Sequence, residues 1–207
     1  MCVVPFIGRQ QGGKIMQATN NKRNVVTLAM GGVLTATVIV LQMLGQFIHL
    51  GPFSVSLVLM PIIIGAAMCS TYISTWLGLV FGIIVLMTDA AAFLAISVPG
   101  TIITVLLKGA MCGLAAGLIY KLISKKNQYL AVVVSAIICP IVNTGIFLIG
   151  CRLFFYDTIS QWGIGAGFSN PVEYMFLGLV GGNFLFELGV NIILCPAIVR
   201  ILRIKIR

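Results

Sequence analysis

Two ionisable residues, Lys108 and Glu187, stand inside long apolar stretches of this 207-residue sequence. A charge at the middle of a bilayer costs about 2.5 to 3.5 kcal/mol on insertion scales, so such residues usually face protein or a water-filled cavity. Asn183 and Asn191 flank Glu187 at four-residue spacing, which places all three on one side of a helix. Asn143 lies in a third apolar stretch. Together these five residues predict a polar pocket for a small molecule, with Lys108 as its positive charge.

A second interpretation is structural, and it stays open. Lys108 and Glu187 would then form an ion pair within the protein, and the asparagines would bond between helices. Asn143, three residues after Pro140, could instead satisfy the backbone that the proline leaves unpaired. His49 and Asp89 are expected at the ends of apolar stretches, either as solvated loop residues or as a gate or substrate contact.

The composition shows which elements must position these residues. Hydrophobic residues make up 60% of the chain and charged residues 8%, against roughly 25% charged in a soluble domain, and the mean hydropathy is +1.14. We therefore predict an all-α membrane protein with six transmembrane helices. The apolar runs place these spans at about residues 25–47, 55–69, 72–87, 101–123, 129–150 and 172–202. Residues 151–171 would be the longest connection, and the last span should tilt or project from the membrane because of its length.

Lysine and arginine concentrate on the cytoplasmic side of membrane proteins, which predicts the orientation. With six spans, one side collects Lys22, Arg23, Lys121, Lys125, Lys126, Arg200, Arg203, Lys205 and Arg207. The other side holds the nearly neutral set His49, Asp89, Arg152, Asp157 and Glu173. Both termini are therefore expected in the cytoplasm.

The chain divides into three predicted segments. Residues 1–23 form a cytoplasmic N-terminal segment, residues 24–204 the six-helix membrane domain, and residues 205–207 a basic tail. Gln10 to Met16 can be encoded by a purine-rich ribosome-binding sequence followed by a start codon. We therefore expect translation to begin at Met16, with residues 1–15 a mis-assigned start; an intact mass that includes Met1 or Cys2 would contradict this.

Small residues at four-residue spacing predict close helix contacts. In the first span Gly32 and Ala36 have this spacing, with Ala29 and Gly31 nearby, and this small-residue stripe could serve packing within the protein or docking of another protein. In the fourth span Gly109, Gly113 and Gly117 repeat the spacing, and packing within the protein is the expected role.

Several function classes lack the residues they require. The sequence has no GxxxxGK[ST], no HExxH, no Ser/His/Asp set and a single histidine, so we expect no enzyme. The six cysteines show no CxxC spacing, and no metal site is expected. The net charge of +9 lies in connections rather than on a soluble basic surface, which argues against nucleic-acid binding.

The chain resembles the substrate-binding S components of energy-coupling factor (ECF) vitamin transporters over about residues 24–203. The similarity is carried by the six-span pattern, the small-residue stripe of the first span and five runs. These are GPFSVSLVLMPIIIGAAM, WLGLVFGIIVLMTD, LLKGAMCGLAAGLIYK, PIVNTGIFLIG and NFLFELGVNIILCPAIVR.

The resemblance implies a multi-pass protein of the bacterial cell membrane that captures a vitamin or related micronutrient from outside. Its partners would be a transmembrane coupling subunit and two ABC ATPases, so ATP would be used by the partners and no cofactor is expected in this chain. Gly32-x-x-x-Ala36 is the nearest match to the family's Ala-x-x-x-Ala docking motif. Residues 51–54 and 89–99 would gate the pocket.

Lys108 favours a carboxylate vitamin, because a ligand carboxylate would relieve an otherwise unpaired buried ammonium. Pantothenate is the first candidate, and riboflavin is the second if Glu187 already neutralises Lys108. Two other classes stay open. One is a self-sufficient secondary transporter, although no internal repeat is visible. The other is an intramembrane enzyme that uses Glu187 or His49 as a base.

Overall fold

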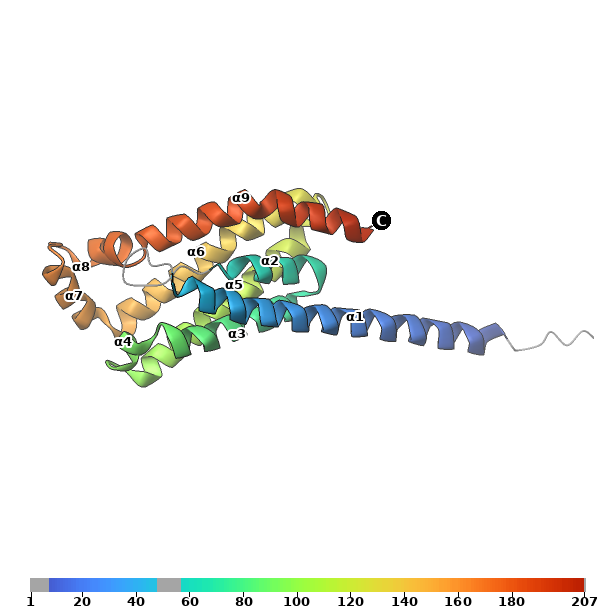
Figure 1. Cartoon of the computed structure of the whole chain (residues 1–207), viewed down its shortest axis with the longest axis horizontal. Coiled ribbons are helices and arrows are strands. Elements are labelled where there is room, and N and C mark those ends of the chain that lie inside the picture. The colour runs from blue at the N-terminus through green and yellow to red at the C-terminus, as the bar shows by residue number, and fades with distance from the viewer. Residues whose placement is uncertain (1–7, 48–56, 207) are drawn as a thin grey trace, which may run out of the picture.

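The computed structural model describes residues 8–47 and 57–206, with side chains described for 25–47 and 57–200. The described residues form a bundle of long helices joined by short helices and turns (Figure 1). The long helices are α1 (Gly8–Gly45), α3 (Thr71–Thr88), α5 (Val98–Ile123), α6 (Gln128–Phe154) and α9 (Gly181–Ile206). Among the described residues these five are long and apolar enough to cross a membrane.

The predicted second span is shorter than expected. Within the described residues it is helix α2 (Leu59–Met68), of ten residues, or roughly half the thickness of a bilayer at 1.5 Å per residue. Most of α2 is buried, and it contacts all five long helices. Five of the six predicted spans are thus matched by long apolar helices, whereas the sixth crossing and the cytoplasmic placement of the termini stay predictions.

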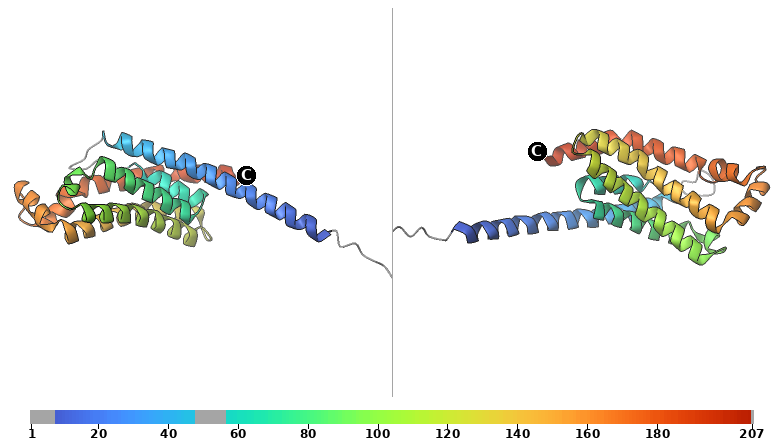
Figure 2. Two further views of the ribbon diagram at one scale, coloured as in Figure 1. Left: turned by 90° about the horizontal axis from the view of Figure 1, so that it is seen from below. Right: turned by 180° about the vertical axis from the view of Figure 1, so that it is seen from behind.

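The bundle has two chemically different ends. At one end lie the short helices α4 (Ala91–Leu94), α7 (Tyr156–Gly165) and α8 (Pro171–Glu173), on the left of Figure 1. We call this the site end. The N-terminal part of α1 and the C-terminal end of α9 both point to the opposite end, which two further views confirm (Figure 2). We call the opposite end the basic end, after its described residues Lys121, Lys125, Lys126 and Arg200.

The last third of the chain differs in detail from the sequence-based expectations. The predicted longest connection, 151–171, contains helix α7. The predicted span 172–202 is not one continuous helix: α8 leads into a π-helical segment, η1 (Tyr174–Leu179), and α9 begins only after a turn at Val180. Hydropathy reports that such a stretch is apolar but not that its hydrogen-bond register changes.

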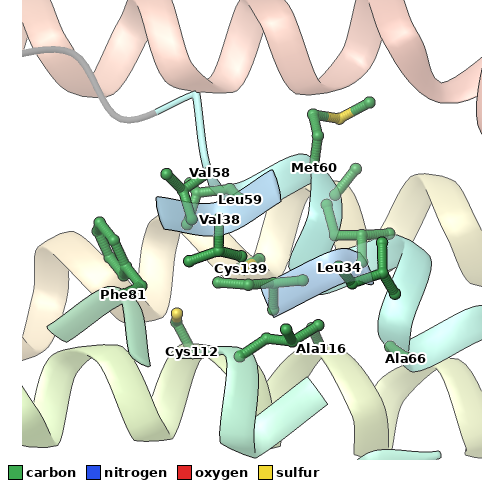
Figure 3. Close-up of a cluster of buried hydrophobic side chains, with 14 of the residues drawn as sticks. Leu34, Val38, Val58, Leu59, Met60, Ala66, Phe81, Cys112, Ala116 and Cys139 are labelled. Carbon is green, nitrogen blue, oxygen red and sulfur yellow. The ribbon is translucent and has the colours of Figure 1, made fainter. Parts of the chain in front are cut away.

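The main hydrophobic core surrounds α2. Val58 and Leu59 are completely buried, and they pack with Val38 of α1, Phe81 of α3 and Cys139 of α6 (Figure 3). A smaller cluster at the site end gathers Phe93, Phe155, Ile159 and Leu179 with their neighbours. Residues of both cores line the cavity described below, Val85 and Val105 from the main core and Phe93 and Phe155 from the smaller one.

Helices α3 and α5 approach each other so closely that only glycine fits at several positions. A Cβ added at Gly78 would collide with the Gly109 carbonyl, and one added at Gly113 would collide with the Ser74 carbonyl. The Ser74 hydroxyl donates a hydrogen bond of 2.7 Å to the Gly113 carbonyl, across the same contact. This confirms that the glycine repeat of the fourth span packs within the protein. Because Lys108 precedes Gly109, the contact also positions that lysine.

We expect Gly109→Ala to lower the melting temperature in detergent, because its methyl group would enter the α3 backbone. Overpacking of this kind costs about 1 to 3 kcal/mol. Gly145→Ala on α6 is the matched control, since a Cβ there meets nothing within 4 Å. Circular dichroism during heating measures both. Equal melting temperatures for the two variants would show that the α3–α5 contact is looser than described.

Candidate functional site

A cavity lies between the long helices toward the site end of the bundle. The cavity has a volume of about 70 Å³, enough for several waters or part of a small organic ligand. Residues from α1, α3, α5, α6 and α9 and from the segments between them form the wall. They are Gln42, Val85, Asp89, Ala90, Phe93, Thr101, Thr104, Val105, Lys108, Asn143, Thr144, Phe147, Phe155, Val180, Asn183, Phe184 and Glu187.

Lys108 lies on the third turn of α5, counted from Val98. Its Nζ is 5.1 Å from the centre of the Phe147 ring and 5.7 Å from that of Phe81, distances typical of cation–π contacts. Glu187 and Asp89 line the same cavity as this lysine. The ammonium group therefore lies against two aromatic rings in a cavity that also carries two carboxylates.

The last helix delivers two of the three residues predicted for the pocket. Asn183 and Glu187 are buried on the first turns of α9, and both line the cavity. Asn191 lies one turn deeper and is absent from the cavity wall. Its Nδ2 lies 3.5 Å from the Ala136 carbonyl of α6, a long hydrogen bond between helices. The structure thus brings Asn183 and Glu187 to the site, and places Asn191 where the structural interpretation expected it.

Buried polar groups from other helices share the wall. Asn143 on α6 is 5% exposed and Thr104 on α5 is 3% exposed. Within the described residues, neither the Asn143 Oδ1 nor the Thr104 Oγ1 has a hydrogen-bond partner. An unpaired buried oxygen costs about 1 to 3 kcal/mol, so a ligand or a water that pairs with it would be stabilised. Asn143 thus lines the cavity with an acceptor oxygen that has no hydrogen-bond partner among the described residues.

Gln42 is a cavity residue that the sequence analysis missed. It is 1% exposed on α1, and its Nε2 donates a hydrogen bond of 2.9 Å to the Asp89 Oδ2. Asp89 caps the end of α3 and also accepts from the Thr88 hydroxyl at 3.0 Å. One carboxylate thus joins α1 to α3 at the edge of the cavity. Gln42 lies near the end of the predicted first span, where polar residues are common. Its position in the sequence therefore does not indicate a cavity residue, and its burial in the structure does.

Aromatic rings form the wall nearest the site end. Phe93 on the four-residue helix α4 meets Phe155 at 4.9 Å, and it meets Phe147 and Trp162 at 5.7 Å each, all edge to face. Such contacts contribute about 0.5 to 1.5 kcal/mol beyond the buried area. Through Trp162, helix α7 holds Phe93 at the cavity wall, and through Phe147 the same group of rings reaches the Lys108 ammonium.

The other predicted residues lie outside the cavity. Ala29, Gly32 and Ala36 are exposed on α1, and a Cβ added at Gly32 meets nothing within 4 Å. The neighbouring Gly31 is buried instead and packs on Ile73 of α3. His49 lies outside the described residues. The small-residue stripe is therefore available on the surface of α1, as a docking role requires.

Comparison with known families decides what kind of protein carries this cavity. The family model described as "ECF transporter, substrate-specific component" matches residues 26–199. This chain belongs to that family. It is thus the substrate-binding S component of a transporter and not a member of an enzyme family. No curated protein and no solved structure matches the chain.

We expect Gln42→Met to destabilise the S component by about 1 to 2 kcal/mol, because it keeps the side-chain size but removes a hydrogen bond to a charged group. Gln46→Met, one turn further along the chain, is the control. In an Asp89→Asn background the effect of Gln42→Met should shrink, which a double-mutant cycle of thermal unfolding measures. An unchanged effect in that background would show that the two side chains do not interact.

Proposed function

We propose that this S component captures a vitamin or related micronutrient from outside the cell and delivers it through an ATPase-driven coupling module. The proposal rests on the composition of the cavity wall, to which five long helices contribute. One ammonium group, two carboxylates, three amides and four phenylalanine rings line this cavity. A small amphipathic ligand suits such a wall, since an apolar site with few polar groups is typical of small-molecule binding.

Two vitamins fit different parts of this wall. Lys108 by itself favours a carboxylate ligand, for which pantothenate is the first candidate. Riboflavin is the second candidate if Glu187, which lines the same cavity, already neutralises Lys108. Riboflavin is uncharged and has a flat ring system that could stack on phenylalanine faces.

The exposed side of α1 supports the partner half of the proposal. Ala29, Gly32 and Ala36 offer a smooth strip on which another helix can lie closely, and Val33 and Val40 flank it with exposed apolar side chains. We propose that a transmembrane coupling subunit docks here, within the lipid bilayer of the bacterial cell membrane. Two ABC ATPase subunits would bind ATP and drive the transport.

Binding by the isolated protein tests the ligand half. We expect the purified chain to bind one vitamin of a panel saturably. Lys108→Ala should weaken an anionic vitamin tenfold or more, about 1.4 kcal/mol, and change a neutral one little. Lys121→Ala at the basic end is the control, and calorimetry measures all three proteins. Absence of saturable binding to any vitamin would contradict the proposal.

Transport tests the partner half. We expect Gly32→Trp to abolish uptake by cells that also produce the coupling subunit and ATPases, while vitamin binding to the purified variant stays unchanged. Gly189→Trp on α9 is matched to it, because a Cβ at either glycine meets nothing within 4 Å. Ion-driven uptake by this chain alone, without partners, would instead identify a secondary transporter.

A further inference from the structure

The four acidic residues of the chain all lie at the site end. The sequence contains four in total. Asp157 is on α7 and Glu173 on α8, whereas Asp89 and Glu187 line the cavity itself. The described lysines and arginines, apart from Lys108 and Arg152, lie at the basic end. A solute that approaches the cavity from the site end therefore meets a surface on which negative charge predominates.

The cavity wall has the same imbalance. Among the described lining residues, one ammonium group, that of Lys108, stands against the carboxylates of Asp89 and Glu187. Arg152 does not offset them, because it is exposed and its guanidinium stacks 3.9 Å from the centre of the Tyr156 ring. The cavity wall therefore carries one excess negative charge. An anion that enters raises this excess to two, whereas a cation cancels it, and the site holds little water to screen these charges.

The site is more than a pair of carboxylates. Asn143 and Thr104 are more than nine-tenths buried on the same wall, and each has an oxygen without a hydrogen-bond partner among the described residues. The Asn143 oxygen accepts hydrogen bonds, and the Thr104 hydroxyl can accept or donate one. Together with the carboxylates, they favour a ligand that brings N–H or O–H donors.

We infer that Glu187 and Asp89 set the charge selectivity of this cavity, which admits neutral or cationic ligands with hydrogen-bond donors and discriminates against anions. Lys108 then serves mainly as the internal counter-charge of Glu187. The inference rests on the proposed function in one respect, namely that this cavity is the ligand site. It makes an uncharged vitamin such as riboflavin, or a cationic one, a better occupant than pantothenate.

Chemical labelling measures the selectivity without knowledge of the natural ligand. Thr144, a partly exposed lining residue, is replaced by cysteine in the full-length protein. Its modification is followed with two methanethiosulfonate reagents of similar size, one ending in trimethylammonium and the other in sulfonate. The protein with native Thr144 gives the background of the native cysteines. The ratio of the two rates reports the charge preference, since a change in thiol reactivity affects both rates equally.

Two substitutions should move this ratio in opposite directions. Glu187→Gln should lower the cation-to-anion ratio roughly three- to thirtyfold, and Lys108→Gln should raise it by a similar factor. Asp89→Asn should act as Glu187→Gln does, but less strongly. The same Glu187→Gln change should leave the ratio unaltered for a cysteine at position 72, which is exposed on α3 far from the cavity.

Each contrary result is decisive. An unchanged ratio in Glu187→Gln would show that this side chain does not set the potential of the cavity. Absence of labelling by both reagents would show that solutes do not reach the cavity from water, which also overturns the inference. A protein that shows the expected ratios but binds no vitamin would retain the charge selectivity and lose the proposed function, so the two failures are distinguishable.

Discussion

The close backbone contact between α3 and α5 is the constraint on which the site depends. Glycines on both helices let carbonyl groups of one helix face the backbone of the other, and Ser74 bonds across the contact. The contact joins the helix that ends at Asp89 to the helix that carries Lys108. It therefore fixes how far apart the acidic and basic groups of the cavity stand. A looser contact would change the electrostatics of the cavity even if every polar residue were kept.

The broken last helix supplies the other side of the cavity. A π-helical segment ends at Leu179, and the chain turns at Val180 before α9 begins. Segments of this kind are uncommon and are found mostly at functional sites. Here the turn starts a stripe of Val180, Asn183, Phe184 and Glu187 that faces the cavity. Asn183 and Glu187 thus lie on the first two turns of α9, directly after the turn at Val180 that separates this helix from the π-helical segment.

The sequence predicts the elements better than their ends and their partners. Spacing alone put Asn183 and Glu187 on one face, because helical periodicity is a local property. Gln42 was missed since its burial depends on α3, which is distant in the chain. The predicted second span, 55–69, is already short for a bilayer, and hydropathy does not show that its helix α2 begins only at Leu59. Phe93 sits on a helix of four residues, whose role comes from the rings that surround it.

Helix α2 has a consequence for the way the chain is made. It contacts α5, α6 and α9, yet residues 59–68 leave the ribosome before any of those helices exists. At that stage its apolar side chains can pack only on α1 and, once it has been synthesised, on α3. The ten residues are too few to cross a bilayer by themselves. The contacts of α2 with α5, α6 and α9 can therefore form only after those helices have been synthesised, and the contact with α9 comes last.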